Sequence, residues 1–413
     1  MLTVALLLSF LVIVPPVTDE ARLVATWTGE TSSGQFGASV SDAGDCNNDG
    51  FADVIVGAPH DQTATVYNGQ KKTVIHVFES SEEDDLFGWS VTGVGDCNGD
   101  GFSEVAVGAP AHENNTGKVY VFNGKTGELL HEFTGDEEGD LFGWSISDAG
   151  DSNGDSFDDL LVGAPGVDDK KLGDDAGQVY VFDGKKGKTL HEIEAITESE
   201  QLGWSVASAG DWDSDGFSDL ILGAPQGAEK KKRPRTGVAR LYHGRKASIL
   251  ATFIGDEEGD RFGHAVHGAG DIDGNSFADV IVGSDTSMSY AVVYGGKKGE
   301  ELYRFESEVE GNRFAWSVGG AGDVNGDSFV DLIIGIPGNL PEEGKGETDS
   351  RVIVYSGKDG TILLSMDGPS HGAHFGCSVS GAGDLNADSF VEVIVGMDGH
   401  GKRPGSARVF GMR

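Results

Sequence analysis

Seven short acidic segments hold the residues of this sequence that are best suited to chemistry. Each follows the pattern Asp-x-(Asn/Asp)-x-(Asp/Asn)-(Gly/Ser)-Phe-x-(Asp/Glu), and they start at Asp45, Asp96, Asp151, Asp211, Asp271, Asp323 and Asp384. Oxygen-bearing side chains at every second position of a tight loop are the ligands that a hard cation such as Ca²⁺ prefers. Asp, Asn and Gly also favour plain turns, which would be the preferred interpretation of a single copy. Seven copies with an oxygen at every ligand position favour metal binding.

The acidic segments differ from EF-hand loops. Position 12 of the first copy is Val56, where an EF-hand needs a bidentate Glu, and an apolar strand follows instead of a helix. Glycine adopts left-handed backbone geometry freely and serine does so only at a cost. Either position 6 is not strongly left-handed, or the four loops with serine are strained. The residues at position 6 are Gly50, Gly101, Gly216, Ser156, Ser276, Ser328 and Ser389.

Each repeat reads as four short strands. In the second repeat these are residues 87–95, then 105–110 after the acidic loop, then 118–122 and 128–133. Four short antiparallel strands form one blade of a β-propeller, and no window shows a sustained helical period. The sequence therefore predicts an all-β, seven-bladed propeller.

The two ends of the chain predict how the ring closes. Residues 23–30 match the fourth strand of other units, such as residues 130–136, whereas the seventh unit stops at its third strand, residues 407–410. We expect the N-terminal strand to complete the last blade in a 3+1 arrangement, which removes free sheet edges. The acidic segments start between 51 and 61 residues apart, so the repeats fill residues 22–413 as a single domain.

The N-terminus, the charge and the cysteines bound the class of protein. Residues 1–16 are apolar but short for a membrane span, so residues 1–18 are predicted to be a signal peptide, and no transmembrane anchor is expected.

The net charge of −38 argues against nucleic acid and anionic membranes as partners. Seven Ca²⁺ would reduce it only to −24, and solubility or a saline habitat would explain the rest. The sequence has three cysteines, Cys46, Cys97 and Cys377, and their number and spacing are not those of a disulfide framework. No disulfide is therefore expected.

Two further motifs recur in register with the acidic loops. Phe-Gly opens most units, as at Phe87-Gly88 and Phe142-Gly143, and Gly-Ala-Pro ends the second strand, as at residues 108–110 and 163–165. Together these motifs resemble FG-GAP repeats, as in the N-terminal β-propeller of integrin α subunits. The resemblance covers residues 22–413, although the motifs drift in the later units.

The resemblance implies that each acidic loop binds Ca²⁺, up to seven ions in all. It implies side-chain ligands at positions 1, 3, 5 and 9 and a backbone carbonyl at position 7. Crowded carboxylates repel one another, so the ions are expected to be structural, and the fourth loop, with four carboxylates, is expected to bind tightest. The implied ligand residues are Asp45, Asn47, Asp49, Phe51, Asp53, Asp96, Asn98, Asp100, Phe102, Glu104, Asp151, Asn153, Asp155, Phe157, Asp159, Asp211, Asp213, Asp215, Phe217, Asp219, Asp271, Asp273, Asn275, Phe277, Asp279, Asp323, Asn325, Asp327, Phe329, Asp331, Asp384, Asn386, Asp388, Phe390 and Glu392.

The blade topology predicts which connections share a face. The metal loops and the 3–4 turns lie on one rim, and the 2–3 and 4–1 connections lie on the other, where the family binds its partners. That second rim is acidic apart from residues 230–235 and 402–404. Residues 230–235 are either a solvated loop or a docking point for an acidic partner, and the sequence does not decide between them.

Four tryptophans and two histidines recur near the start of the first strands. Trp89, Trp144, Trp204 and Trp316 follow the Phe-Gly position, which favours packing between blades over a role in stacking sugars. His264 and His267 replace Trp and Ser in the fifth unit, and a packed or surface role is favoured over a metal-binding pair.

The sequence favours a Ca²⁺-stabilised recognition module that binds an extracellular protein or glycan. The expected location is extracellular, at the cell surface or in the periplasm. The alternative is a glycan-active enzyme, a lyase or hydrolase, on the same scaffold. Catalysis needs converging acid–base or nucleophile groups, and nearly every conspicuous carboxylate is already assigned to a metal loop. Because a fold alone does not give a function, the recognition reading depends on the resemblance.

Overall fold

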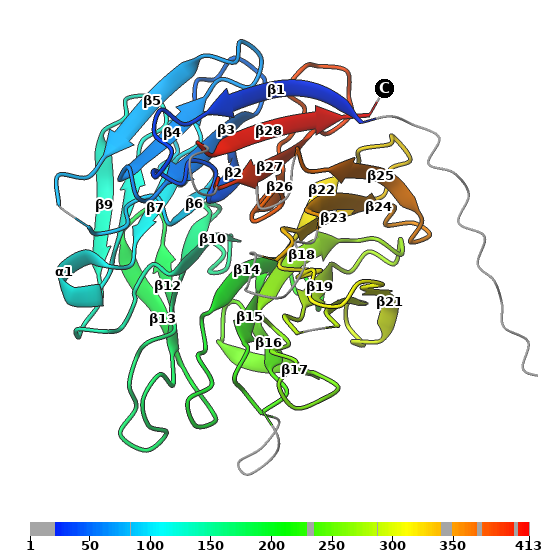
Figure 1. Ribbon diagram of the computed structural model, residues 1–413. Coiled ribbons are helices and arrows are strands. Elements are labelled where there is room, and N and C mark those ends of the chain that lie inside the picture. The colour runs from blue at the N-terminus through cyan, green and yellow to red at the C-terminus, as the bar shows by residue number, and fades with distance from the viewer. Residues whose placement is uncertain are drawn as a thin grey trace, which may run out of the picture.

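The computed structural model describes residues 21–82, 84–228, 235–286, 288–339, 349–369, 374–399 and 404–412. Seven four-stranded sheets stand side by side as a ring, with the first strand of each sheet nearest the centre (Figure 1). Every pairing within these sheets is antiparallel, as in Leu160 opposite Phe182. The predicted seven-bladed propeller is confirmed. The predicted signal peptide and residues 230–234 and 402–403 lie outside the described part of the chain.

Blades 1 to 6 each contain four strands in chain order. The strands of the first three blades are β2 (Ser39–Gly44), β3 (Asp53–Ala58), β4 (Thr63–Tyr67), β5 (Val74–Glu79), β6 (Ser90–Gly93), β7 (Val105–Ala109), β8 (Lys118–Phe122), β9 (Leu129–Thr134), β10 (Ser145–Gly150), β11 (Asp159–Ala164), β12 (Gln178–Asp183) and β13 (Lys188–Glu194). The strands of the next three are β14 (Ser205–Gly210), β15 (Asp219–Ala224), β16 (Val238–His243), β17 (Ser248–Ile254), β18 (Ala265–Gly270), β19 (Asp279–Gly283), β20 (Tyr290–Tyr294), β21 (Glu301–Glu306), β22 (Ser317–Gly322), β23 (Asp331–Ile336), β24 (Arg351–Tyr355) and β25 (Ile362–Asp367).

Blade 7 joins the two ends of the chain. It is formed by β26 (Val379–Gly381), β27 (Val393–Met397) and β28 (Ser406–Gly411), with β1 (Arg22–Thr28) as its outermost strand. Strand β1 pairs antiparallel with β28, and Figure 1 shows the two strands side by side. The predicted 3+1 closure by the N-terminal strand agrees with this sheet.

Helix is almost absent from the described residues. The element α1 (His112–Asn115) has only four residues, and Glu113 and Asn114 have φ angles of 45° and 59°, so it is a turn in the 2–3 connection of blade 2. Across the described ranges, no helix reaches the length and apolarity that a membrane crossing requires.

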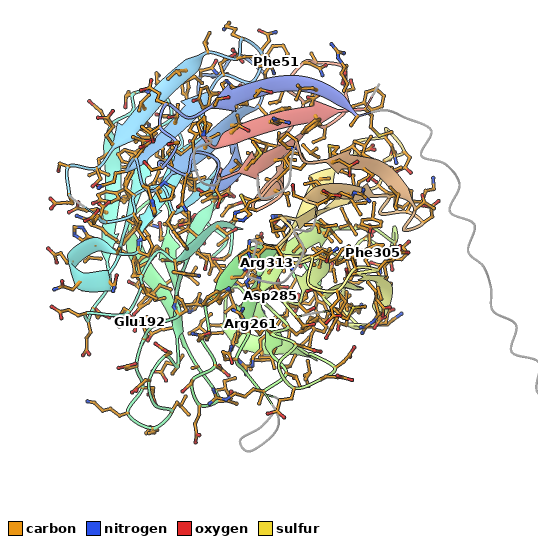
Figure 2. The ribbon with its side chains drawn as sticks, in the orientation of Figure 1. Phe51, Glu192, Arg261, Asp285, Phe305 and Arg313 are labelled. Carbon is orange, nitrogen blue, oxygen red and sulfur yellow. The ribbon has the colours of Figure 1, made fainter. Side chains whose placement is uncertain are left out.

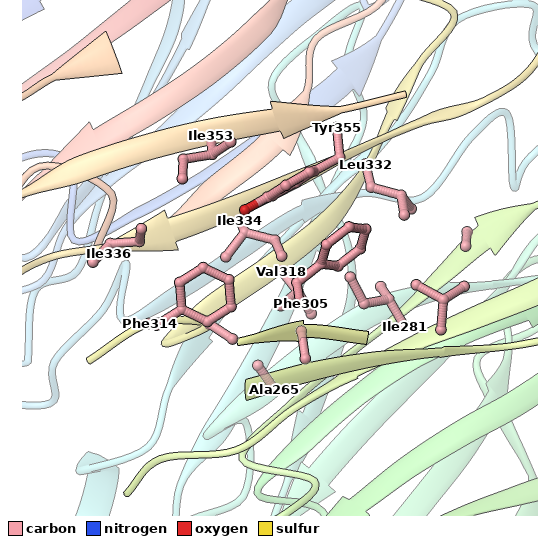
Figure 3. Close-up of a cluster of buried hydrophobic side chains, with 14 of the residues drawn as sticks. Ala265, Ile281, Phe305, Phe314, Val318, Leu332, Ile334, Ile336, Ile353 and Tyr355 are labelled. Carbon is pink, nitrogen blue, oxygen red and sulfur yellow. The ribbon is translucent and has the colours of Figure 1, made fainter. Parts of the chain in front are cut away.

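The hydrophobic core lies between blades. Seven clusters of buried side chains each combine strands from two neighbouring blades. Figure 3 shows the cluster between blades 5 and 6, where the rings of Phe305 and Tyr355 stack with centroids 4.1 Å apart. Phe314, at the Phe-Gly position of blade 6, packs in the same cluster and is 3% exposed. Because each blade buries its apolar faces only against its neighbours, stability depends on the complete ring.

The Phe-Gly and Gly-Ala-Pro motifs meet where blades touch. A Cβ atom added to Gly163, the Gly-Ala-Pro glycine of blade 3, would lie 2.1 Å from the carbonyl oxygen of Gly203 in blade 4. That same carbonyl accepts a hydrogen bond of 2.8 Å from Ser145 Oγ. The same close contact between backbones recurs between blades 7 and 1, where a Cβ atom added to Gly396 would lie 2.2 Å from the carbonyl oxygen of Gly37. The motifs therefore permit close backbone contact between neighbouring blades.

Candidate metal centres

The seven acidic loops lie at the same end of the ring. Each connects the first strand of a blade to the second, and its position 9 residue lies at or just before the start of the second strand, as Asp159 begins β11. In blade 3 the register shifts between Asp148 and Gly150, and Gly150 then pairs with Asp159. The loop is thus held at both ends by the ladder of the first two strands.

The loop backbone is left-handed at two positions. The residues at positions 4 and 6 have positive φ angles in all seven copies, and at position 6 these run from 70° in Ser156 to 91° in Gly216. Serine at position 6 adopts the same geometry as glycine, with φ of 72° in Ser328 and 73° in Ser389. Of the two alternatives left open by the sequence, strain in the serine loops is the correct one.

Backbone donors surround the carboxylate at position 1. In blade 2, the N–H groups of Gly99, Asp100 and Gly101 donate to Asp96 at 2.7, 3.0 and 2.9 Å. At position 5, Asp100 Oδ1 accepts from the N–H of Phe102 at 3.1 Å. These bonds hold the loop in shape with its carboxylates gathered together.

In blades 2 and 3 the 3–4 turn lies against the acidic loop of the same blade. In blade 2, Asn123 Nδ2 donates to Asp100 Oδ2 at 2.8 Å, and in blade 3, Lys186 Nζ lies 2.9 Å from Asp155 Oδ2. The Lys185 ammonium lies 3.5 Å from the centre of the Phe157 ring at position 7. The predicted sharing of one rim by the 1–2 loops and the 3–4 turns is confirmed.

Position 9 is a fully buried carboxylate in every blade. Asp219 is 0% exposed, and its two oxygens accept from the N–H groups of Trp212 and Gly244, both at 3.1 Å. Burial raises the pKa of Asp219 to about 7 despite these hydrogen bonds. Burial raises the pKa of Asp53 to about 6 and that of Glu392 to about 7 in the same way. Burial disfavours the charged form of these carboxylates, and a cation bound beside them would favour it.

Position 3 divides the loops into two chemical kinds. In three of the five loops with Asn at this position the amide donates to the buried carboxylate, as Asn153 Nδ2 does to Asp159 Oδ1 at 2.8 Å. Where it is Asp, three carboxylates come together without such a donor. Among the described residues, two loops place three ligand oxygens within 4.8 Å of one another, namely Asp211, Asp213 and Asp219 in blade 4 and Asp271, Asp273 and Asp279 in blade 5.

The donor sets fit a divalent cation. Asp213 Oδ1 is buried and has no hydrogen-bond partner, and it lies within the three-carboxylate cluster of blade 4. An acceptor of this kind needs a cation or a proton beside it. The structure keeps all of the predicted ligand residues within their own loops, and their role as ligands stays a prediction. A bound divalent ion would neutralise the gathered carboxylates and hold the 1–2 loop.

One candidate ligand was missed by the sequence analysis. His243 closes β16 and contacts Asp215 of the blade 4 loop, with Nε2 3.0 Å from Asp215 Oδ2. It occupies the turn position that Asn68 and Asn123 occupy in blades 1 and 2. Alignment of the 3–4 turns of the blades is the signal that distinguishes it.

On the face opposite the acidic loops, an arc of aromatic rings lines an open cavity at the centre of the ring, which we call the aromatic mouth. Centroid distances are 4.7 Å for Trp89 and Trp144, 4.9 Å for Trp144 and Trp204, 5.8 Å for Trp204 and His264, and 4.5 Å for His264 and Trp316. The predicted packing of the tryptophans between blades is confirmed. The tryptophans remain only partly buried, and a cavity of about 290 Å³ opens beside them.

Charged side chains cover one side of this aromatic arc. The Arg313 guanidinium lies 3.8 Å from the centre of the Trp316 ring, and that of Arg261 lies 5.3 Å from Trp204. Arg261 Nη1 also lies 2.6 Å from Asp285 Oδ2. Figure 2 shows Arg261, Asp285 and Arg313 together near the middle of the ring.

The two histidines of blade 5 do not form a pair. His264 lies in the aromatic arc, and burial lowers its pKa to about 4, so the ring is neutral at neutral pH. His267 lines a separate cavity with Asp148 and Ser208, and burial also lowers its pKa. The favoured packed role is confirmed for His264.

The aromatic arc and the acidic loops lie at opposite ends of the first strands. In blade 3, Trp144 directly precedes β10 and Asp151 directly follows it. Six strand residues span about 20 Å at 3.3 Å per residue. The ring therefore has one rim of acidic loops and one aromatic mouth on the other face.

Comparison with known proteins agrees with this geometry. The FG-GAP repeat family matches residues 87–122, 142–182, 202–242 and 314–355, which lie in blades 2, 3, 4 and 6. Integrin alpha-V from Gallus gallus is 33% identical over 226 residues, which are 50% of this chain and 21% of the relative. Integrin alpha-5 from Xenopus laevis is 32% identical over 228 residues, 51% of this chain and 21% of the relative. Integrin alpha-PS2 from Drosophila melanogaster is 31% identical over 235 residues, 51% of this chain and 16% of the relative. The chain thus matches between 16% and 21% of the length of these relatives.

Proposed function

We propose that this chain, which is an FG-GAP repeat protein similar to integrin alpha subunits, is a Ca²⁺-stabilised recognition module that binds an extracellular protein or glycan. The proposed location is extracellular or at the cell surface, because the similar proteins are integrin alpha subunits, and nothing favours the periplasm. Residues 1–18 would act as the signal peptide, and residues 22–413 as a single propeller domain.

Calcium is proposed for all seven acidic loops. The support is the buried carboxylate at position 9 of each blade, together with backbone donors that gather the remaining oxygens. Extracellular modules built from such ligands bind Ca²⁺ at about 10⁻⁴–10⁻³ M. The ion would be structural, since it would neutralise carboxylates that repel one another at one rim of the ring.

Recognition is placed at the aromatic mouth. The observation that carries this proposal is the separation of the two ends of the first strands, with acidic loops at one end and the arc of Trp89, Trp144, Trp204 and Trp316 at the other. Partly exposed tryptophan faces suit contact with a protein side chain or a sugar ring, because they bury large areas without losing much side-chain freedom.

Recognition is favoured over glycan hydrolysis or elimination. A glycoside hydrolase needs two carboxyl groups that act together across the bond that breaks. At the aromatic mouth, Asp285 is paired with Arg261 at 2.6 Å, and His264 is buried. We therefore propose that the chain is not an enzyme.

The proposal is tested by binding of the purified chain to glycan arrays, extracellular protein panels and cells, each with Ca²⁺ and with chelator. We expect binding that requires Ca²⁺ and that falls at least tenfold in Trp144→Ala. Leu129→Ala in β9 serves as the matched control, since Leu129 is 48% exposed on an outer strand away from the mouth. Absence of binding in both conditions would refute the recognition role, and full binding by Trp144→Ala would refute the site.

A further inference from the structure

Blade 4 differs from the other blades at the turn that covers its acidic loop. The last residue of β16 is His243, which is 3% exposed. A histidine at this point brings an imidazole against a loop of carboxylates. The equivalent residues in the other blades with a 3–4 turn are Asn68, Asn123, Asp183, Gly295 and Ser356.

The imidazole joins two overlapping groups of acidic ligands. Ligand atoms of Asp213, Asp215 and His243 lie within 4.8 Å of one another, and so do those of Asp211, Asp213 and Asp219. His243 Nε2 lies 3.0 Å from Asp215 Oδ2, and His243 Nδ1 lies 3.9 Å from Asp219 Oδ1. Asp213 belongs to both groups, so one ion beside it could contact nitrogen and oxygen ligands together.

The hydrogen bonds at this site are incomplete. His243 Nδ1 and Asp213 Oδ1 are both buried without a hydrogen-bond partner. In blade 2 the residue at the same turn position is satisfied, since Asn123 Nδ2 donates to both Asp100 and Glu104. A neutral imidazole has only one N–H and cannot repeat this double donation. Leaving a buried polar atom unpaired is costly, and a cation bound beside Asp213 would give its free oxygen a partner.

The donor chemistry identifies the class of ion. Ca²⁺ takes oxygen ligands only, whereas imidazole together with carboxylates suits a first-row transition ion such as Zn²⁺. We propose that the blade 4 loop binds Zn²⁺, or a transition ion of similar preference, through His243, Asp213 and the neighbouring carboxylates. This inference rests on the proposed role of the acidic loops as cation sites, and it assigns a different ion to one of them.

A simpler arrangement competes with the proposed site. A protonated His243 would form an ion pair with Asp215, and the Lys246 ammonium, which contacts His243 Nε2, would add positive charge to the cluster. In that arrangement the loop would bind Ca²⁺ or no ion. Zn²⁺ would then have no preference for blade 4.

The test is native mass spectrometry of the full chain with Ca²⁺ and increasing Zn²⁺. We expect one Zn²⁺ to bind in exchange for at most one Ca²⁺, and His243→Asn to lower the affinity for that Zn²⁺ at least tenfold. Asn is already the residue of blades 1 and 2, so this variant is expected to fold. His60→Asn is the matched control, because His60 is exposed and lies in blade 1 away from the loop.

Co²⁺ gives a second readout through its visible absorption. The visible spectrum of bound Co²⁺ depends on its ligands and geometry, so it should be the same in the native protein and in His60→Asn, and different in position and intensity in His243→Asn. Equal Zn²⁺ affinity in the native protein and His243→Asn would overturn this inference, as would a protein that binds Ca²⁺ but no Zn²⁺. Zn²⁺ binding through His243 without any bound Ca²⁺ would instead refute calcium in the other loops and leave this inference standing.

Discussion

Removal of Ca²⁺ should destabilise the ring as a whole. Each of the seven loops gathers carboxylates around a fully buried position 9 residue, so each should bind one cation in the folded state and none in the unfolded state. With Ca²⁺ as the only divalent ion in solution, all seven sites, including that of blade 4, should hold Ca²⁺. At about 1 mM Ca²⁺ and dissociation constants of about 10⁻⁴–10⁻³ M, one site stabilises the folded state by about 0.4–1.4 kcal/mol. Seven sites together contribute about 3–10 kcal/mol, provided they bind independently.

This free energy predicts the change in melting temperature. The entropy of unfolding is about 2.1 cal/mol/K per residue, or about 0.9 kcal/mol/K for 413 residues. Chelation should therefore lower Tm by about 3–12 °C. Differential scanning calorimetry in 1 mM Ca²⁺ and in excess chelator, at the same pH and ionic strength, measures it.

Asp213→Asn is the matched variant for this experiment. It gives blade 4 the Asn that five other loops carry at position 3, and in blade 3 that Asn donates to the buried carboxylate at 2.8 Å. In chelator the variant should melt above the native protein, because one of three crowded carboxylates is removed, and its Ca²⁺-dependent change in Tm should be smaller. A native melt that chelator leaves unchanged within about 1 °C would refute the structural role of the ion. Equal Ca²⁺ dependence in the variant and the native protein would refute the role of Asp213.

Three further predictions concern the scaffold. Gly163→Ala should lower the free energy of unfolding in urea by about 3 kcal/mol or more, because its Cβ would lie 2.1 Å from the Gly203 carbonyl oxygen. Gly216→Ala, which has open space around its Cβ but a φ of 91°, should lower it by only about 1–2 kcal/mol. Equal losses in the two variants would contradict the role of the contact between blades. Ser328→Gly should raise stability by about 0.5–1 kcal/mol in the same assay, because φ at this residue is 72°, and a loss would argue against strain. Burial raises the pKa of Asp148 to about 7, so its ionisation weakens the fold as pH rises from about 4 to 7, and Asp148→Asn should be more stable than the native protein at pH 7.5 by up to about 4 kcal/mol. Unfolding at pH 5 and pH 7.5 tests this, and parallel pH dependence of the two proteins would contradict it.

The blade count and the closure were predictable because each blade has a local signature. The acidic loop, the Phe-Gly pair and the apolar second strand all lie within one repeat, and the strands that pair inside a blade are close in sequence. Closure needed one long-range comparison, between residues 23–30 and the other fourth strands, and β1 pairs with β28 as expected.

The candidate site was predictable only in part. The candidate ligands of the acidic loops could be predicted, because oxygen-bearing side chains at alternate positions within nine residues lie close to one point. His243 did not, because its contact with Asp215 joins the 3–4 turn to the 1–2 loop across 28 residues of sequence. The tryptophans were predicted to pack between blades, but only the closed ring brings them together around one cavity.

The sequence by itself determined the number of blades, the strand order within each and the chemical type of the acidic loops, because these depend on residue type and local spacing. The tertiary structure decided how near the blades approach, which carboxylates lose contact with water and which turn covers which loop. The Gly163 contact with Gly203 and the raised pKa of Asp219 are examples. Distances between blades and the burial of side chains depend on segments that are far apart in the sequence, and only the closed ring brings these segments together.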